Sequence, residues 1–121
     1  MLLILRRLKQ HGHNAYAILG GATGQIGDPS GKNLERVMKS MDEIDNNSKA
    51  IEAQIIKYAQ TEVINNNTIY QKMSMFDFLR NIGKLVNVNY LLEKDLIKSR
   101  LDVGISFTEF SYALIQGYDF A

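Results

Sequence analysis

The chain opens with apolar and basic residues at the spacing of one amphipathic helix. The apolar positions of this pattern are Leu2, Leu3, Leu5 and Leu8, and the basic positions are Arg6, Arg7 and Lys9. Gly12 is a natural stop for such a helix. The apolar run from Ala15 to Leu19 then predicts a short buried strand. The N-terminal part is therefore expected to form a helix followed by a strand.

The middle of the chain is polar and has a weaker pattern. Residues 33–49 show no clear periodicity, and the polar cluster at 45–48 predicts a break. A helical stripe covers 50–59, and the β-branched pair at 63–64 predicts a brief second strand that ends in asparagines. We expect the segment from residue 32 to residue 45 to be a mobile loop.

The C-terminal half carries two helix-start signals. Ser74 and Asp77, and likewise Ser106 and Glu109, have the spacing of a capping box before an apolar run. The second box opens a helix that extends toward the C-terminus, and another helix is expected over 90–100. Strands separated by helices predict an α/β domain with a parallel sheet.

Composition places the chain among ordinary soluble domains. Its 121 residues suffice for one small domain, with 45% hydrophobic and 22% charged residues. The net charge of +1 gives no strong general attraction to nucleic acid or membrane. There is no cysteine, which excludes disulfides and thiolate metal sites and suits a reducing cytoplasm. The apolar opening is too short to span a membrane.

The stretch GGATGQIGDPSGK, residues 20–32, contains five glycines and follows the first predicted strand directly. It fits neither the Walker A pattern nor the dinucleotide pattern G-x-G-x-x-G. Its place after a strand is where open α/β sheets bind ligands. Two interpretations stay open, namely a loop that contacts a ligand and a tight structural turn.

Three polar residues share one face of the last predicted helix. Tyr112, Gln116 and Asp119 are spaced i, i+4 and i+7, which places them nearly above one another. The rest of this helix is largely apolar. The row is either a solvated stripe on a surface helix or the wall of a pocket for a small polar molecule.

Two long motifs together resemble the catalytic domain of bacterial tyrosyl-tRNA synthetases. They are GGATGQIGDPSGK followed by Arg36, and GISFTEFSYALIQGYDF near the C-terminus. The connecting segments FLRNIGK, VNYLLEKD and KSRLDVG resemble the same family in the same order, and 38–70 is the loosest part. The resemblance implies a class I Rossmann-type fold, a parallel sheet with flanking helices. It also implies a cytoplasmic homodimer that activates tyrosine with ATP and Mg²⁺ and transfers it to tRNA(Tyr).

The same resemblance implies a tyrosine pocket. Its members would be Thr23, Asp28, Asn67, Tyr112, Gln116 and Asp119. Thr23 and Asp28 would lie at the amino group of tyrosine, and Asp119 would accept the phenolic hydroxyl. Lys32 and Arg36 would be the catalytic cations that meet the ATP phosphates. No metal ligands are expected, because the pair His11 and His13 alone makes a poor site.

The chain departs from the family pattern at both ends. The His-x-Gly-His signature is absent, and Lys72–Met75 only imitates the Lys-Met-Ser-Lys-Ser signature. Residues 1–121 are therefore expected to be one partial catalytic domain that lacks activity in isolation. Phe107 is a candidate for the dimer interface.

Two other functions stay open. A non-catalytic paralogue that binds an aromatic amino acid or a protein partner would show the same lost signatures. A tryptophan-specific synthetase is the other alternative, and Asp119 argues against it because an indole offers no hydroxyl at that depth.

Overall fold

The computed structural model describes residues 1–29 and 36–121, apart from the side chain of Leu96. The elements in chain order are α1 (Leu2–Gln10), β1 (Tyr16–Leu19), α2 (Thr23–Ile26), α3 (Met41–Ala59), β2 (Glu62–Asn65), α4 (Asn67–Tyr70), α5 (Met75–Asp77), a π-helical turn η1 (Phe78–Ile82), a 3₁₀ turn η2 (Gly83–Leu85), α6 (Val88–Leu92), α7 (Asp95–Leu101) and α8 (Phe107–Tyr118).

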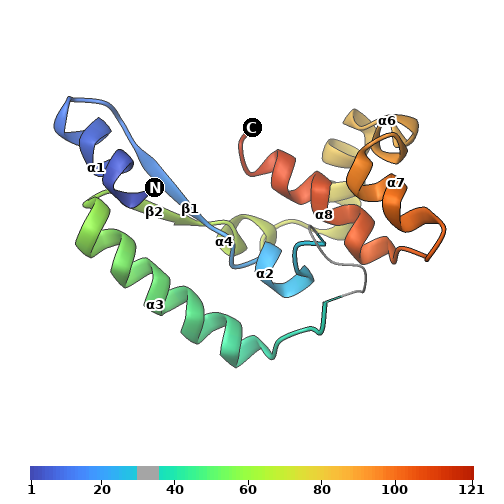
Figure 1. The fold of residues 1–121 in the computed structure, drawn as a ribbon, viewed down its shortest axis with the longest axis horizontal. Coiled ribbons are helices and arrows are strands. Elements are labelled where there is room, and N and C mark those ends of the chain that lie inside the picture. Colours follow the sequence, from blue (N-terminus) through green and yellow to red (C-terminus); the bar gives the residue numbers. More distant parts are fainter. Residues whose placement is uncertain (30–35) are drawn as a thin grey trace.

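The elements form two groups that meet at the ends of the strands. α1, α3 and the two strands lie at one end of the molecule, and α6, α7 and α8 lie at the other (Figure 1). The short helices α2 and α4, which follow β1 and β2, lie between the two groups (Figure 1). The carboxyl ends of the strands therefore face the group that contains α8.

The sheet consists of β1 and β2, which pair in parallel from Tyr16 opposite Glu62 to Leu19 opposite Asn65. A parallel pair needs a crossover connection, and the long helix α3 lies in that connection. The predicted α/β class with a parallel sheet and flanking helices is confirmed.

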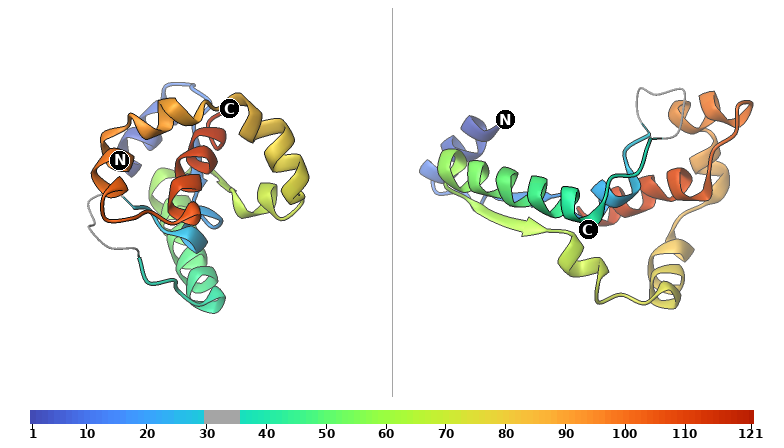
Figure 2. Two further views of the ribbon diagram at one scale, coloured as in Figure 1. Left: turned by 90° about the vertical axis from the view of Figure 1, so that its right-hand side faces the viewer. Right: turned by 90° about the horizontal axis from the view of Figure 1, so that it is seen from below.

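One face of the sheet is covered and the other is open. Ala17 packs against Ile55 and Ala59 of α3, and the partly buried Leu2, Leu5 and Val63 border this core. α1 and α3 therefore lie on the same side of the strands, as the view from below also shows (Figure 2). On the other face Tyr16 and Ile18 stay 52% and 37% exposed. The sequence predicted that β1 is buried, and this prediction was right for one face of the strand only.

The break predicted at 45–48 was wrong, because α3 continues through it. Ser40 caps the helix by accepting a hydrogen bond from the backbone N–H of Glu43 at 3.2 Å. Ile44 and Ser48 are buried on the face that also carries Ile55, whereas 45–47 are exposed. Burial of one face outweighs the low helix propensity of the polar cluster. Residues 41–45 of the expected loop are consequently helical.

The C-terminal helices agree with the capping signals but not with every predicted length. The hydroxyls of Ser74 and Ser106 accept from the backbone N–H groups of Asp77 and Glu109, which confirms both caps. The single helix expected over 90–100 is two helices, because Lys94 has extended backbone angles between α6 and α7. In the described part of the chain, no helix combines the length and apolar character that a membrane span requires.

Candidate functional site

The carboxylate of Asp119 lies at the C-terminal end of α8 and is held by two side chains. One of its oxygens, Oδ2, accepts a hydrogen bond from Nδ2 of Asn66 at 2.8 Å. The other, Oδ1, lies 2.9 Å from the hydroxyl of Tyr70, which is also 2.8 Å from the carbonyl oxygen of Ile115. A carboxylate oxygen can accept more than one hydrogen bond. Asp119 is therefore oriented and still able to accept a bond from a ligand.

Asn66 connects three segments at the carboxyl ends of the strands. Its side chain is fully buried, and its Oδ1 accepts from the backbone N–H of Ala22 at 2.7 Å. Its Nδ2 reaches Asp119 and lies 3.4 Å from the hydroxyl of Thr23. Its backbone N–H bonds the carbonyl of Leu19 at the end of β1. Asn66 therefore ties the glycine loop to α8.

Sequence reasoning missed Asn66 and selected its neighbour Asn67. The Oδ1 of Asn67 accepts from Nε2 of Gln25 at 3.0 Å, so its described side-chain partner lies on α2. Position relative to β2 was the signal that could have found Asn66, which directly follows the strand. The role proposed for Asn67 stays a prediction.

Sequence reasoning also missed Tyr70, whose hydroxyl is the second hydrogen-bonding partner of the Asp119 carboxylate. Burial raises the pKa of Tyr70, and the hydrogen bond to Asp119 and the negative charge of Asp119 raise it further. A phenolate beside a carboxylate would be repelled. Tyr70 therefore stays protonated and able to donate a hydrogen bond.

Tyr112 brings the glycine loop into the same site. Partial burial raises the pKa of Tyr112, and the negative charges of Asp28 and Asp119 raise it further, whereas Arg36 acts in the opposite direction. Such charge effects need short separations. Asp28, Arg36 and Asp119 therefore all lie near Tyr112 in space, although Arg36 and Asp119 are 83 positions apart along the chain.

The remaining predicted residues are distributed as follows. The side-chain Nε of Arg36 donates to the backbone carbonyl of Asp28, so the cation is tied to the glycine loop. Thr23 begins α2 and reaches Asn66. Gln116 lies on α8 with an exposed side chain. Lys32 lies outside the described residues. The structure thus gathers Thr23, Asp28, Arg36, Tyr112 and Asp119 at one end of the strands.

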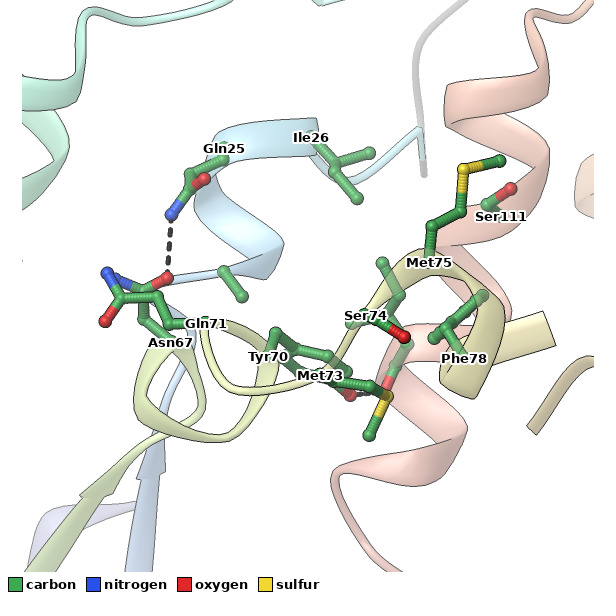
Figure 3. A pocket seen from close by; sticks show the side chains of 12 residues that line it. Gln25, Ile26, Asn67, Tyr70, Gln71, Met73, Ser74, Met75, Phe78 and Ser111 are labelled. Atoms are coloured by element: carbon green, nitrogen blue, oxygen red, sulfur yellow. Dashed lines mark hydrogen bonds between the residues drawn. The ribbon is translucent and has the colours of Figure 1, made fainter. Parts of the chain in front are cut away.

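A cavity of about 350 Å³ is lined in part by Tyr70, whose hydroxyl bonds Asp119, and by Asn67, the one predicted tyrosine-binding residue among its described lining residues. Figure 3 shows the cavity between α2, α4, the segment that enters α5, and α8. Its polar lining consists of amides and hydroxyls, among them Gln25, Asn67 and Ser111, and none of the described residues that line it is charged. The volume lies within the range of about 300–1,000 Å³ that is usual for small-molecule sites.

The described residues contain no group of three or more His, Asp or Glu side chains that could hold a metal ion. The site as described therefore offers carboxylates, hydroxyls, amides and one guanidinium. These groups suit a ligand that carries both hydroxyl and amino groups.

Comparison with known proteins identifies the family. Residues 1–121 match the family described as tRNA synthetases class I (W and Y). The chain belongs to this family. The class I synthetase fold inferred from the glycine loop and the α8 motif is thereby confirmed.

Relatives within the class I synthetases carry more specific names. A tyrosine–tRNA ligase of Ureaplasma urealyticum is 52% identical over 120 residues, which are 99% of this chain and 29% of the relative. A tyrosine–tRNA ligase of Pediococcus pentosaceus is 48% identical over 121 residues, again 29% of the relative. The chain therefore spans less than a third of the curated relatives that it matches.

A solved structure shows the same arrangement of elements. The C-terminally truncated mitochondrial tyrosyl-tRNA synthetase of Aspergillus nidulans superposes with a TM-score of 0.81 at 27% identity. The match covers 98% of this chain and 39% of that structure. The class I synthetase fold thus accounts for nearly all of the chain.

Proposed function

We propose that the full-length protein to which this chain belongs is a tyrosine–tRNA ligase. It activates tyrosine with ATP and transfers the tyrosyl group to tRNA(Tyr). The observation that carries this proposal is the Asp119 carboxylate, held through both oxygens by Asn66 and Tyr70. The names of the relatives support the same substrate. Residues 1–121 then form part of one catalytic domain.

Asp119 recognises the phenolic hydroxyl of tyrosine in this proposal. Asn66 and Tyr70 fix the plane of the carboxylate, so the remaining acceptor positions have a fixed direction. Phenylalanine lacks the hydroxyl and would leave the carboxylate without the partner that replaces water. The site therefore favours tyrosine over phenylalanine.

The amino group of tyrosine lies toward Asp28 in this proposal. Asp28 supplies negative charge, and Tyr112, Thr23 and Gln116 supply hydroxyl and amide groups for an ammonium. Tyr112 is close enough to both Asp28 and Asp119 for their charges to raise its pKa. A single amino acid between these two carboxylates would therefore present its amino group to one and its hydroxyl to the other.

The activation step joins tyrosine to AMP. A carboxylate oxygen of tyrosine attacks the α-phosphorus of ATP, and the bond to the leaving pyrophosphate breaks. Negative charge grows on the phosphate oxygens, so positioned cations stabilise the transition state. Arg36 and Lys32 are the proposed cations, and Mg²⁺ enters as the ion bound to the ATP phosphates. The bond from Arg36 to the Asp28 carbonyl keeps this cation beside the amino-acid site.

The proposal includes a cytoplasmic homodimer with Phe107 in its interface. Phe107 is 72% exposed at the start of α8, and its ring stacks on that of Phe110 with centroids 6.4 Å apart. An exposed aromatic side chain such as Phe107 is typical of residues that contact a protein partner. Size-exclusion chromatography of the full-length protein at several concentrations should show a dimer, and a monomer throughout would contradict this part.

Exchange of pyrophosphate into ATP tests the proposed activity. The full-length protein should support exchange with tyrosine and at least about a hundredfold less with phenylalanine or tryptophan. Exchange driven by tryptophan, or none with any amino acid, would overturn the proposal. The 121-residue chain in isolation should show no exchange with tyrosine.

A further inference from the structure

Arg100 and Glu109 form a buried ion pair between α7 and the first turn of α8. Nη1 of Arg100 lies 3.1 Å from Oε1 of Glu109, and Nη2 lies 3.1 Å from Oε2. The two side chains are only 6% and 3% exposed. Two parallel bonds of this kind fix the relative direction of guanidinium and carboxylate as well as their distance.

The pair holds one end of α8, and the Asp119 cluster holds the other. Arg100 also donates from Nη2 to the carbonyl of Gly104 at 3.4 Å, which closes the turn between the two helices. Ser106 caps the backbone of Glu109 in the same turn. Between the two ends α8 presents Tyr112 and the other proposed tyrosine-binding residues.

The ion pair is better suited to orientation than to stability. Taking two charges out of water has a large desolvation cost, and apolar replacements of buried pairs are often as stable or more stable. A bidentate pair, in contrast, permits few alternative geometries. The direction of α8 is therefore the property that this pair controls best.

A small tilt of α8 has a large effect at the site. Tyr112 and Asp119 are separated by about 10 Å along the helix axis at 1.5 Å per residue. A tilt of about 5° around Asp119 would therefore move Tyr112 by about 1 Å. A misplacement of about 1 Å in a binding site can reduce activity by about a hundredfold.

We propose that Arg100 and Glu109 are positioning residues that set the direction of α8 and thereby the affinity for tyrosine. This inference rests on the proposed function, because Tyr112, Gln116 and Asp119 are its proposed tyrosine contacts. It assigns Arg100 and Glu109 no contact with substrate. The proposed ATP cations Lys32 and Arg36 belong to another segment of the sequence, so the KM for ATP should respond much less than the KM for tyrosine.

Steady-state exchange kinetics of the full-length protein test this inference. Glu109→Gln keeps the shape of the side chain and removes its charge. The KM for tyrosine should rise by between about tenfold and about a hundredfold, while the KM for ATP stays within about twofold. Arg100→Lys keeps the charge but loses the two-point geometry, and it should raise the KM for tyrosine by a smaller factor. It serves as the second variant should Glu109→Gln not fold.

Two controls separate positioning from stability. Glu43→Gln makes the same chemical change in an exposed pair formed by Glu43, in the first turn of α3, and Lys39, just before this helix. Their side chains are 50% and 54% exposed. This variant should leave both KM values unchanged. Ile55→Ala removes core contacts far from α8 and lowers the melting temperature. At a temperature where both proteins are folded, it should leave the KM for tyrosine unchanged.

The outcomes distinguish this inference from the proposed function. Wild-type protein without tyrosine-dependent exchange would overturn the proposed function. Active wild type with an unchanged KM for tyrosine in Glu109→Gln and Arg100→Lys would overturn the positioning role alone. So would equal rises of the KM for tyrosine in Glu109→Gln and in Ile55→Ala.

Discussion

The core beside the sheet and the Asp119 site are held by different kinds of contact. At the sheet end, Ala17, Ile55 and Ala59 form an apolar core that α1 and α3 cover. At the α8 end, Asn66 and Tyr70 hold Asp119 through directional hydrogen bonds. Apolar contacts depend on area and tolerate small shifts, whereas hydrogen bonds weaken steeply with misalignment.

The apolar core should therefore control the stability of the fold, whereas the directional hydrogen bonds should control the geometry of the site. The apolar core supplies burial without specifying where a substrate atom lies. The polar contacts at α8 fix the direction of one carboxylate and one helix. Changes at the sheet end should therefore act on unfolding, and changes at the α8 end should act on tyrosine recognition. The following predictions test that separation in order of expected effect.

Ile55→Ala should have the largest effect on stability. It removes a buried side chain from the core beside Ala17 and Ala59 and leaves a cavity. We expect a loss of about 2–5 kcal/mol in the free energy of unfolding, and about 0.5–1.5 kcal/mol for the smaller change Ile55→Val. Thermal unfolding of the full-length protein measures the loss. If the KM for tyrosine also changed in these variants, in proportion to the lost stability, the sheet core would not act on unfolding alone.

Asp119→Asn should have the largest effect on recognition. It keeps the size of the side chain but replaces the charged acceptor with a neutral amide, one side of which donates. Hydrogen bonds to charged groups contribute about 1.5–3 kcal/mol, so kcat/KM for tyrosine should fall between about tenfold and about a hundredfold. The preference over phenylalanine should shrink by the same factor. An unchanged preference would show that Asp119 does not face the hydroxyl.

Asn66→Ala and Asn67→Ala form a matched pair of neighbouring variants. Asn66 holds Asp119 and also accepts from the backbone of Ala22, so its loss should reduce kcat/KM for tyrosine by about tenfold. Asn67 bonds Gln25 at a partly buried position, and its loss should change kcat/KM by less than about threefold. Equal effects of the two variants would contradict the placement of Asn66 on Asp119.

Tyr70→Phe should have the smallest effect at neutral pH and a distinct effect in alkali. The pKa of Tyr70 is raised in the folded protein, by burial first and then by Asp119. Its contribution to stability is therefore fully present below the unfolded value near pH ~10 and is lost as pH rises beyond it. Tyr70→Phe lacks this loss. Its melting temperature should fall less steeply than that of the wild type above pH ~10.

Below that pH, Tyr70→Phe should lower the free energy of unfolding by about 1 kcal/mol through the lost hydrogen bond. Tyr112 also has a raised pKa, so part of the alkaline loss should persist in this variant. Parallel curves for wild type and variant above pH ~10 would count against a protonated Tyr70 beside Asp119.

The predictable features are those that depend on near neighbours in the chain. The caps at Ser74 and Ser106 involve backbone groups three residues away, and both were predicted correctly. The two strands and the helix after Ser106 were found for the same reason. The continuous helix through 45–48 was missed because burial of Ile44 and Ser48 against distant segments overrides local propensity.

The sequence by itself determined the family, the α/β class and the two motifs that meet at the ends of the strands. Spacing placed Tyr112 and Asp119 on one face of α8, because the helix repeat depends only on the backbone. Only the tertiary structure decided that Asn66 rather than Asn67 holds Asp119, and that Arg100 pairs with Glu109. These choices depend on how rigid elements distant in the chain are placed, and a hydrogen bond forms only within a few tenths of an ångström of its ideal length.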